Sequence, residues 1–245
     1  QRDATGAVTS LNRFEAASLS VNQVSGRIAG DGPGRLDSVH YSRQGASMLA
    51  LPTGPGAAAP PPASADVPKL RHLNLEFARG LAGNLLARDI AAEGDIRTVY
   101  GPVNSWEERL SMTPGGRPGP ETLWITCDRL AVAESPLGRL QNPTTGLRRE
   151  MGPIELQAQG NVEIELDHPQ RGAVWLRGDE ASFDQLKSMF TLRGSSRRLA
   201  TITNQQYPGA PPSEAPAEGF IFYQNTGEVK LISPRGQFWQ FDGVK

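Results

Sequence analysis

The chain has 245 residues and a formal net charge of −1, from 25 Lys and Arg side chains and 26 Asp and Glu side chains. A charge this close to zero argues against a nucleic-acid-binding protein, which normally carries a strong basic excess. The single cysteine, Cys127, excludes an internal disulfide and a cysteine-rich zinc site. No apolar run approaches the roughly 20 residues of a membrane-spanning helix. The chain starts without methionine or a signal-peptide pattern, so we expect a fragment of a longer protein.

Stretches rich in Gly and Pro divide the chain and predict the boundaries of its parts. We expect an N-terminal β-repeat segment over 1–53, a Pro/Ala-rich linker or long loop over 54–68, a second β-repeat segment over 69–112, a Gly/Pro loop over 113–120, and a β-rich core over 121–245. That core is either a separate unit or continuous with 69–112.

Residues 30–34 of the first segment read Gly-Asp-Gly-Pro-Gly. This sequence lacks the Gly-Lys-Ser/Thr ending and the following helix of a phosphate-binding loop, so it predicts a turn between strands. Helical candidates are few in the whole chain. Residues 16–21 and 179–189 are the stretches that could each form a turn of helix.

Apolar and polar side chains alternate with a period of two in the third segment, which is typical of strands with one buried face. Ile154, Leu156, Val162 and Ile164 are separated by acidic and amide side chains. An Asn-Thr-Gly sequence at 225–227 lies between two apolar stretches and predicts a hairpin.

A Gly-Asp or Gly-Asn step recurs between pairs of these predicted strands, at 94–95, 160–161 and 178–179. Glycine allows the bulge or sharp bend that a strand needs to change direction. Repeats of this kind predict stacked β-units that share one continuous core.

Side chains that could carry catalysis are scattered. His40, His72 and His168 occur singly, outside any metal-binding spacing, and we expect them at the surface or in loops. There is no Gly-x-Ser-x-Gly nucleophile elbow and no calcium-loop sequence. Cys127 lies in a strand-like stretch and is expected to be a small buried hydrophobic residue. We therefore expect no enzyme activity, no cofactor and no metal.

The phrases AQGNVEIE at 158–165, LRGDEASFD at 176–184, FTLRGS at 190–195 and IFYQNTGEVKL at 221–231 resemble the OstA-like family of periplasmic lipopolysaccharide-transport proteins. The likeness extends over about 121–241 and is weaker over 73–103 and 14–39. The proline-rich loops are longer than the family pattern. The resemblance implies an all-β fold, a slotted antiparallel β-jellyroll, with an apolar interior groove for acyl chains and strand edges that pair with neighbouring jellyrolls.

The resemblance also implies site residues. The lipid-groove candidates are Ile154, Leu156, Val162, Ile164, Val174, Leu176, Phe183, Leu192, Phe220, Phe222, Val229 and Leu231. Arg193, Arg197 and Arg198 are basic candidates at the groove mouth, where they would contact phosphates or acidic sugars. The alternatives are an ordinary closed β-sandwich core for the apolar set and a solvated loop for the arginines.

These observations predict a non-enzymatic, periplasmic or outer-membrane-associated protein that holds lipopolysaccharide or another lipid. Its other partners would be neighbouring β-jellyroll proteins, joined by edge-strand pairing. The alternative is a purely structural or interaction β-repeat region of a large envelope protein. A carbohydrate-processing β-helix enzyme is disfavoured, because the chain shows no clustered carboxylates and aromatics on successive strands.

Overall fold

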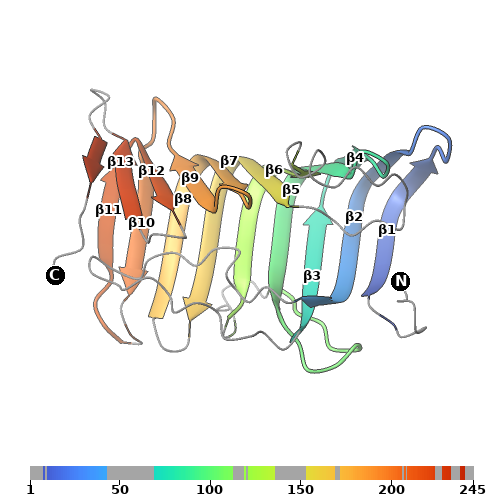
Figure 1. Cartoon of the computed structure of the whole chain (residues 1–245), viewed down its shortest axis with the longest axis horizontal. Helices are drawn as coiled ribbons and strands as arrows, with labels where there is room; N and C mark the ends of the chain where they lie inside the picture. The colour runs from blue at the N-terminus through green and yellow to red at the C-terminus, as the bar shows by residue number, and fades with distance from the viewer. Residues whose placement is uncertain are drawn as a thin grey trace.

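The computed structural model describes residues 8, 10–42, 69–112, 119, 121–135, 153–168, 172–205, 207, 209–223, 228–232 and 238–240. These residues form fourteen strands of one sheet, in which all paired strands are antiparallel (Figure 1). The described part of the chain contains no helix, and therefore none long and apolar enough to cross a membrane. The prediction of an all-β antiparallel fold is confirmed.

The strands follow the chain in a nearly regular order across the sheet, so neighbours in sequence are mostly neighbours in space (Figure 1). Their bounds are β1 (Ser10–Val21), β2 (Arg27–Ser42), β3 (Lys69–Phe77), β4 (Gly80–Asn84), β5 (Asp89–Pro102), β6 (Leu123–Glu134), β7 (Ile154–His168), β8 (Gly172–Asp184), β9 (Met189–Arg193), β10 (Ala200–Gln205), β11 (Ser213–Ala217), β12 (Gly219–Tyr223), β13 (Glu228–Ile232) and β14 (Phe238–Gln240).

Three local predictions were wrong. Residues 16–21 belong to β1, and residues 179–189 belong to the end of β8, a turn and the start of β9, so neither forms a helix. Cross-strand pairing overrides their weak helical tendency. Residues 30–34 lie inside β2 and not in a turn between strands. The predicted hairpin exists as the β12–β13 pair, although its turn residues lie outside the described part of the chain.

The long strands bend at one common level, which we call the crease. Register shifts interrupt the ladders of β5 with β6 between Glu93 and Ile96, and of β7 with β8 between Gln159 and Val162. At these points Gly94 and Gly160 adopt φ values of 84° and 73°. The following residues, Asp95 and Asn161, also have positive φ. The predicted bulge is therefore confirmed at the 94–95 and 160–161 steps, whereas Gly178 and Asp179 do not have positive φ.

Separate strands also fill the two sides of the crease. β3 pairs with residues 34–42 of β2 and 97–102 of β5, whereas β4 pairs with residues 27–31 of β2 and 89–93 of β5. The strands β2, β3, β5 and β4 thus form a closed circuit of pairings. Within it, β3 and β4 both lie between β2 and β5, one on each side of the crease. In the same way, β10 and β9 pair with the two parts of β8 on either side of the crease, β10 with 173–177 and β9 with 180–184.

The crease divides the sheet into two leaves. We call them the β3 leaf and the β4 leaf, after the strand that lies wholly in each. The β3 leaf comprises 10–16, 34–42, β3, 96–102, 123–127, 162–168, 172–178, β10 and β11. The β4 leaf comprises 18–21, 27–31, β4, 89–93, 129–134, 154–159, 180–184, β9, β12 and β13.

The main hydrophobic core draws on the inner faces of both leaves. Ile96, Ile125 and Ile164 come from the β3 leaf, and Ala158 and Phe183 come from the β4 leaf. Every connection between successive strands from β1 to β13 starts and ends in the same leaf, except those that pass through the crease. Within the part of the chain that the structure describes, the covalent crossings between the two leaves therefore all lie along the crease.

Candidate functional site

The predicted groove residues lie on the inner faces of the leaves. Nine of them are buried, namely Ile154, Val162, Ile164, Val174, Leu176, Phe183, Leu192, Phe220 and Phe222. Leu156, Val229 and Leu231 are partly buried and pack against the main core. Val162 and Leu192 have no exposed surface, so protein atoms fill the space around them. The leaves are packed against each other in this central part of the interior.

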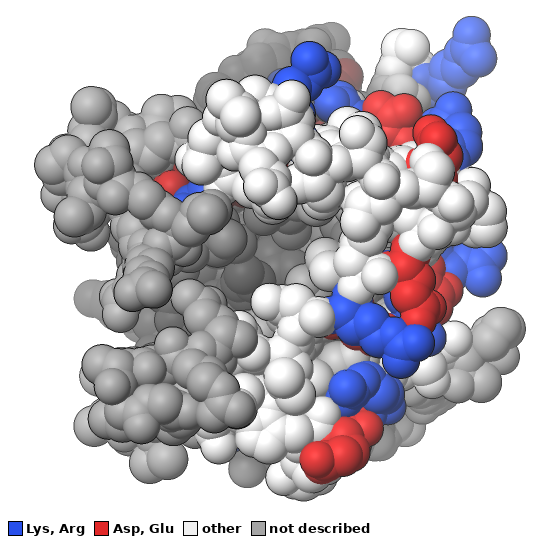
Figure 2. Space-filling view, turned by 90° about the vertical axis from the view of Figure 1, so that its right-hand side faces the viewer, with Lys and Arg blue, Asp and Glu red and all other residues white. Residues whose placement is uncertain are grey.

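The inner face opens at the β1 end. Leu19 and Val21 pair with Gly30 and Ile28 of β2, and paired residues of an antiparallel ladder point to the same side. Gly30 faces inward, because a β-carbon placed on it would lie 3.4 Å from the ring of Phe14. Leu19 and Val21 are nonetheless 52% and 45% exposed. Figure 2 views the molecule from this end and shows a hollow whose described rim is mostly uncharged.

The three predicted basic residues come together at the crease. Arg193, Arg197 and Arg198 line a pocket of about 600 Å³ around the 194–199 connection between β9 and β10. Arg198 bonds the carboxylate of Asp179 and the carbonyl oxygen of Gly178, each at 2.8 Å. Hydrogen bonding from Ser195, together with Arg198, holds the pKa of Asp179 below its usual value. Arg198 therefore ties the connection to β8.

The expectation for two of the histidines was wrong. His72 lies in β3, and His40 lies in β2 and is partly buried. His72 has no exposed surface, and its Nε2 atom is 3.0 Å from Oδ1 of Asp37. Cross-strand contact with a buried partner, which single-residue spacing does not reveal, buries it on the outer face of the sheet. His168 ends β7.

The Asp37–His72 pair is a structural contact, even though such a pair can serve catalysis. The backbone N–H of Leu110 donates to Nδ1 of His72 at 3.0 Å, so Nδ1 is an acceptor and Nε2–H donates to Asp37. Burial lowers the pKa of His72 despite the Asp37 carboxylate. With both ring nitrogens engaged, the imidazole has no free atom for a substrate proton.

This contact holds residues 103–112 over the outer face of the β3 leaf. A second small core of Val39, Leu70 and Val103 lies there, with Trp106 and Leu110 packed against it. Hydrogen bonds from Asn74, Arg35 and His72 hold the pKa of Asp37 below its usual value, although burial alone would raise it. The buried carboxylate is thus fully engaged in structure.

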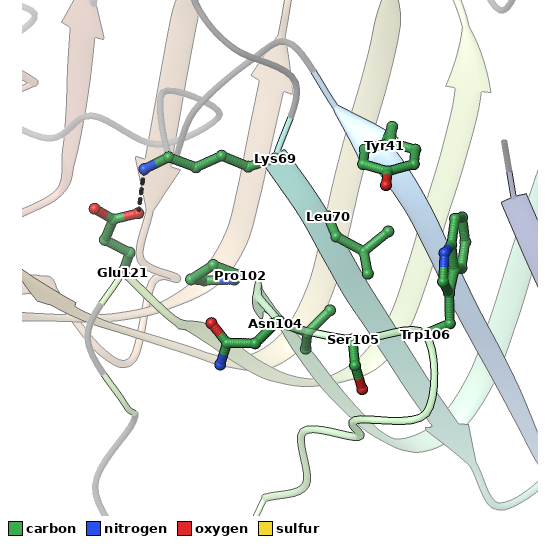
Figure 3. Close-up of a pocket in the computed structure, with 9 residues that line it drawn as sticks. Tyr41, Lys69, Leu70, Pro102, Asn104, Ser105, Trp106 and Glu121 are labelled. Carbon is green, nitrogen blue, oxygen red and sulfur yellow. Dashed lines mark ion pairs between the residues drawn. The ribbon is translucent and has the colours of Figure 1, made fainter.

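A pocket of about 580 Å³ opens beside the start of β3 (Figure 3). Tyr41 and Trp106, whose ring centroids lie 5.4 Å apart, form one side, and the Lys69–Glu121 ion pair forms the other. The Lys69 Nζ and Glu121 Oε2 atoms are 3.8 Å apart. A pocket with aromatic and charged walls can hold a polar ligand.

Arg71 lies next to this pocket and was missed by the sequence analysis. It has no exposed surface, and its side chain lies over the ring of Tyr100, 5.4 Å from the centroid. The signal was present in the alternation of β3, where Arg71 shares the phase of Leu73, Leu75 and Phe77. A charged residue in an apolar phase marks either a buried partner or a site.

Other reactive groups offer little chemistry. Cys127 is buried as predicted, and burial raises the pKa of its thiol to about 12, so it is not a thiolate at neutral pH. Within the described residues, no three His, Cys, Asp or Glu side chains are grouped to hold a metal ion. No protein-family model matches the chain, and no curated protein matches it.

Proposed function

We propose that this chain is a non-enzymatic jellyroll module of the cell envelope that shelters acyl chains between its leaves and joins neighbouring β-proteins through its strand edges. The observation that carries the proposal is the pair of apolar inner faces that meet along one crease and that no described connection bridges elsewhere. The likeness of 121–241 to OstA-like lipopolysaccharide-transport proteins supports the jellyroll assignment and the periplasmic or outer-membrane location.

The β1 end favours lipid entry. Inner-face side chains there, such as Leu19 and Val21, are already half exposed, whereas the central ones are fully packed. An acyl chain that enters at this end gains about 0.8 kcal/mol for each buried methylene group. Because the described connections cross between the leaves only at the crease, the leaves can part at this end without breaking one of them.

The second candidate is a purely structural or interaction module. The closed packing around Val162 and Leu192 favours it, because a filled interior needs no ligand. β1 also forms one end of the sheet order, and among the described strands it pairs with β2 alone. Such an edge strand can bind a strand from another protein. The two candidates differ in whether the inner face at the β1 end binds lipid.

Two matched substitutions in β1 test the difference. Leu11 and Leu19 are 45% and 52% exposed, but they lie on opposite faces of the sheet. Leu11 pairs with Val39 of the outer small core, and Leu19 pairs with the inward-facing Gly30. Leu19→Glu places a charge on the proposed lipid path, and Leu11→Glu places the same charge outside it.

The measurement is native mass spectrometry with lipid extraction, on chains purified from a Gram-negative host and then titrated with lipopolysaccharide. We expect about one lipid per wild-type chain, the same for Leu11→Glu, and at least a tenfold loss of binding for Leu19→Glu, which is about 1.4 kcal/mol. A lipid-free wild type that stays unchanged on titration supports the structural module instead. Equal loss in both variants means that lipid binds the edge and not the interior.

A further inference from the structure

We propose that Arg71 and Lys69 form a binding site for one oxyanion, a phosphate or carboxylate group, and that the Glu121 carboxylate occupies this site when no ligand is bound. The site lies at the start of β3, beside the pocket of Figure 3. The proposal is independent of acyl-chain binding, because it concerns a charged group at the margin of the sheet.

The first observation is the state of the Arg71 guanidinium. Its side chain is 1% exposed, yet Nε, Nη1 and Nη2 find no hydrogen-bond acceptor among the described residues. A buried guanidinium without acceptors is costly, because it has lost its hydration without replacement. Its planar donors match the geometry of a carboxylate or phosphate, which supplies several acceptor oxygens at once.

The second observation is the incomplete contact with Glu121. Its Oε2 atom is 4.0 Å from Nη2 of Arg71 and 3.8 Å from Nζ of Lys69, so it reaches hydrogen-bond distance of neither. Glu121 also has a φ of 57°, which is unfavourable for a residue with a side chain. The carboxylate compensates charge but leaves the Arg71 donors unpaired. A ligand with more oxygen atoms would satisfy these donors better.

The surroundings favour an anion over a cation. Lys69 and Arg71 are two residues apart in β3, so their side chains leave the strand on the same side. Together with Glu121 they carry a net charge of +1. His40 pairs with Arg71 across the ladder, and burial, together with the Arg71 charge, lowers the pKa of His40. His40 is therefore neutral at pH 7 and can accept or donate a hydrogen bond beside the site.

The pocket of Figure 3 provides the route to the site. Lys69 and Glu121 both line it, and Oε2 of Glu121 lies 4.0 Å from Nη2 of Arg71. An incoming oxyanion would displace the Glu121 carboxylate and replace its long contacts with direct hydrogen bonds.

The test is titration calorimetry on the full 245-residue chain with three probes. Inorganic phosphate tests the anion alone, dodecyl phosphate tests an anionic amphiphile, and dodecyl maltoside is the amphiphile with an uncharged head group. Glu121→Gln removes the competing charge and should raise affinity for the phosphate probes about tenfold, which is about 1.4 kcal/mol. Arg71→Met keeps a long side chain without the charge and should abolish binding.

Arg97→Met is the control, because Arg97 is half exposed and bonds Asp95 on the neighbouring β5. It should bind like the wild type. Equal binding of inorganic and dodecyl phosphate supports a free-anion site, and much tighter binding of dodecyl phosphate supports the head group of an amphiphile. The proposal is overturned if neither phosphate probe binds the wild type or Glu121→Gln. It is also overturned if Arg71→Met binds normally, or if Arg71→Met lowers the melting temperature of the ligand-free protein, since that result would mean that the guanidinium is already satisfied.

Discussion

The two halves of the inner face share one folding pattern but differ in what they expose. From β6 to β12 the inner residues are nearly all apolar and mostly buried, as Ile164, Leu176 and Phe222 illustrate, with the buried Glu134 as an exception. From β1 to β5 the same face combines apolar residues with polar ones and is exposed at Leu19. The polar residues of this half include Ser10, Asn12, Ser38, His40, Arg71 and Thr98, which share one face by their ladder pairing.

This difference indicates that the two halves of one continuous sheet have different roles, stability in the later strands and ligand contact in the early ones. The later strands bury enough apolar surface to stabilise the fold without any ligand. The early strands leave an apolar mouth and an unsatisfied guanidinium, and they stabilise themselves with a second core on the outer face. Residues that cost stability are concentrated in the half that we propose to bind ligands, which is the usual relation between binding sites and stability.

The largest expected effect is the loss of stability when a charge is introduced on the inner face, compared between the two halves. Ile164→Asp introduces a carboxylate where the side chain is 2% exposed, whereas Leu19→Asp introduces it where the side chain is 52% exposed. We expect Ile164→Asp to lower the free energy of unfolding by about 4 kcal/mol or more, because an unpaired buried charge must be desolvated. We expect Leu19→Asp to change it by only about 0.5 kcal/mol.

Urea unfolding followed by circular dichroism measures both values. Glu163→Ala, at an exposed position next to Ile164, controls for the strand itself and should be nearly neutral. If Ile164→Asp unfolds as the wild type does, the inward assignment of β7 is wrong. If Leu19→Asp is as damaging as Ile164→Asp, the β1 end is closed in solution and the contrast between the halves disappears.

A smaller effect concerns the crease, where each half has a glycine with positive φ. A β-carbon at Gly160 would lie 2.2 Å from Oδ2 of Asp128, which is held by a 3.0 Å hydrogen bond from Asn161. A β-carbon at Gly94 would meet the Arg79 side chain instead, at 2.6 Å. In both alanine variants, the positive φ should lower the free energy of unfolding by about 1 kcal/mol. Gly160→Ala should cost about 1 kcal/mol more, because it also breaks the Asp128–Asn161 contact.

Thermal unfolding of the two variants gives this difference directly. Gly209→Ala is the matched control, since Gly209 has a φ of 89° and nothing lies within 4 Å of the added carbon. Equal losses for Gly94→Ala and Gly209→Ala would show that Arg79 moves aside freely. A Gly160→Ala variant no less stable than Gly209→Ala would show that the two halves of the crease are equally adaptable.

Sequence periodicity predicted the parts of the fold that depend on local rules. Alternation in β7 and β8 identified the inner residues from Ile154 to Leu176, and the Gly-Asn step at 160–161 identified a bend. Both follow from backbone geometry within a few residues. Residues 30–34 were misassigned because a strand that bends at a crease has the same glycine content as a turn between two strands.

The site residues of the early strands depend on partners that are distant in sequence. Asp37 meets His72 across the β2–β3 pair, and Leu110 completes the contact from beyond β5. Glu121 contacts Arg71 from a position 50 residues later in the chain. No spacing rule links residues that meet through the register of a sheet. The sequence could therefore indicate the burial of Arg71 only through its alternation in step with apolar residues of the same strand.

The smallest expected effect is a pH dependence of stability that is confined to the early strands. Burial lowers the pKa of both His40 and His72 from the ordinary value of 6.5, and both lie in the early strands. Below pH 6.5 the unfolded chain therefore binds more protons than the folded chain, and the stability that these neutral histidines support decreases as the pH falls toward their folded-state pKa values. Above pH 6.5 that stability is fully present. The lowered pKa of Asp37 acts in the same direction, but only at pH values below its ordinary 3.8.

Hydrogen exchange at pH 7.5 and pH 5.5, corrected for the intrinsic exchange rate, resolves the effect by strand. We expect β2, β3 and residues 103–112 to lose protection at pH 5.5, while β7 and β8 keep theirs, because the Leu110–His72 hydrogen bond requires an unprotonated Nδ1 atom. His72→Gln should remove most of this pH dependence, at the cost of lower protection at both pH values. A uniform loss of protection across all strands at pH 5.5 would mean that the sheet opens as one cooperative unit, and that the contrast between its halves lies in ligand binding and not in stability.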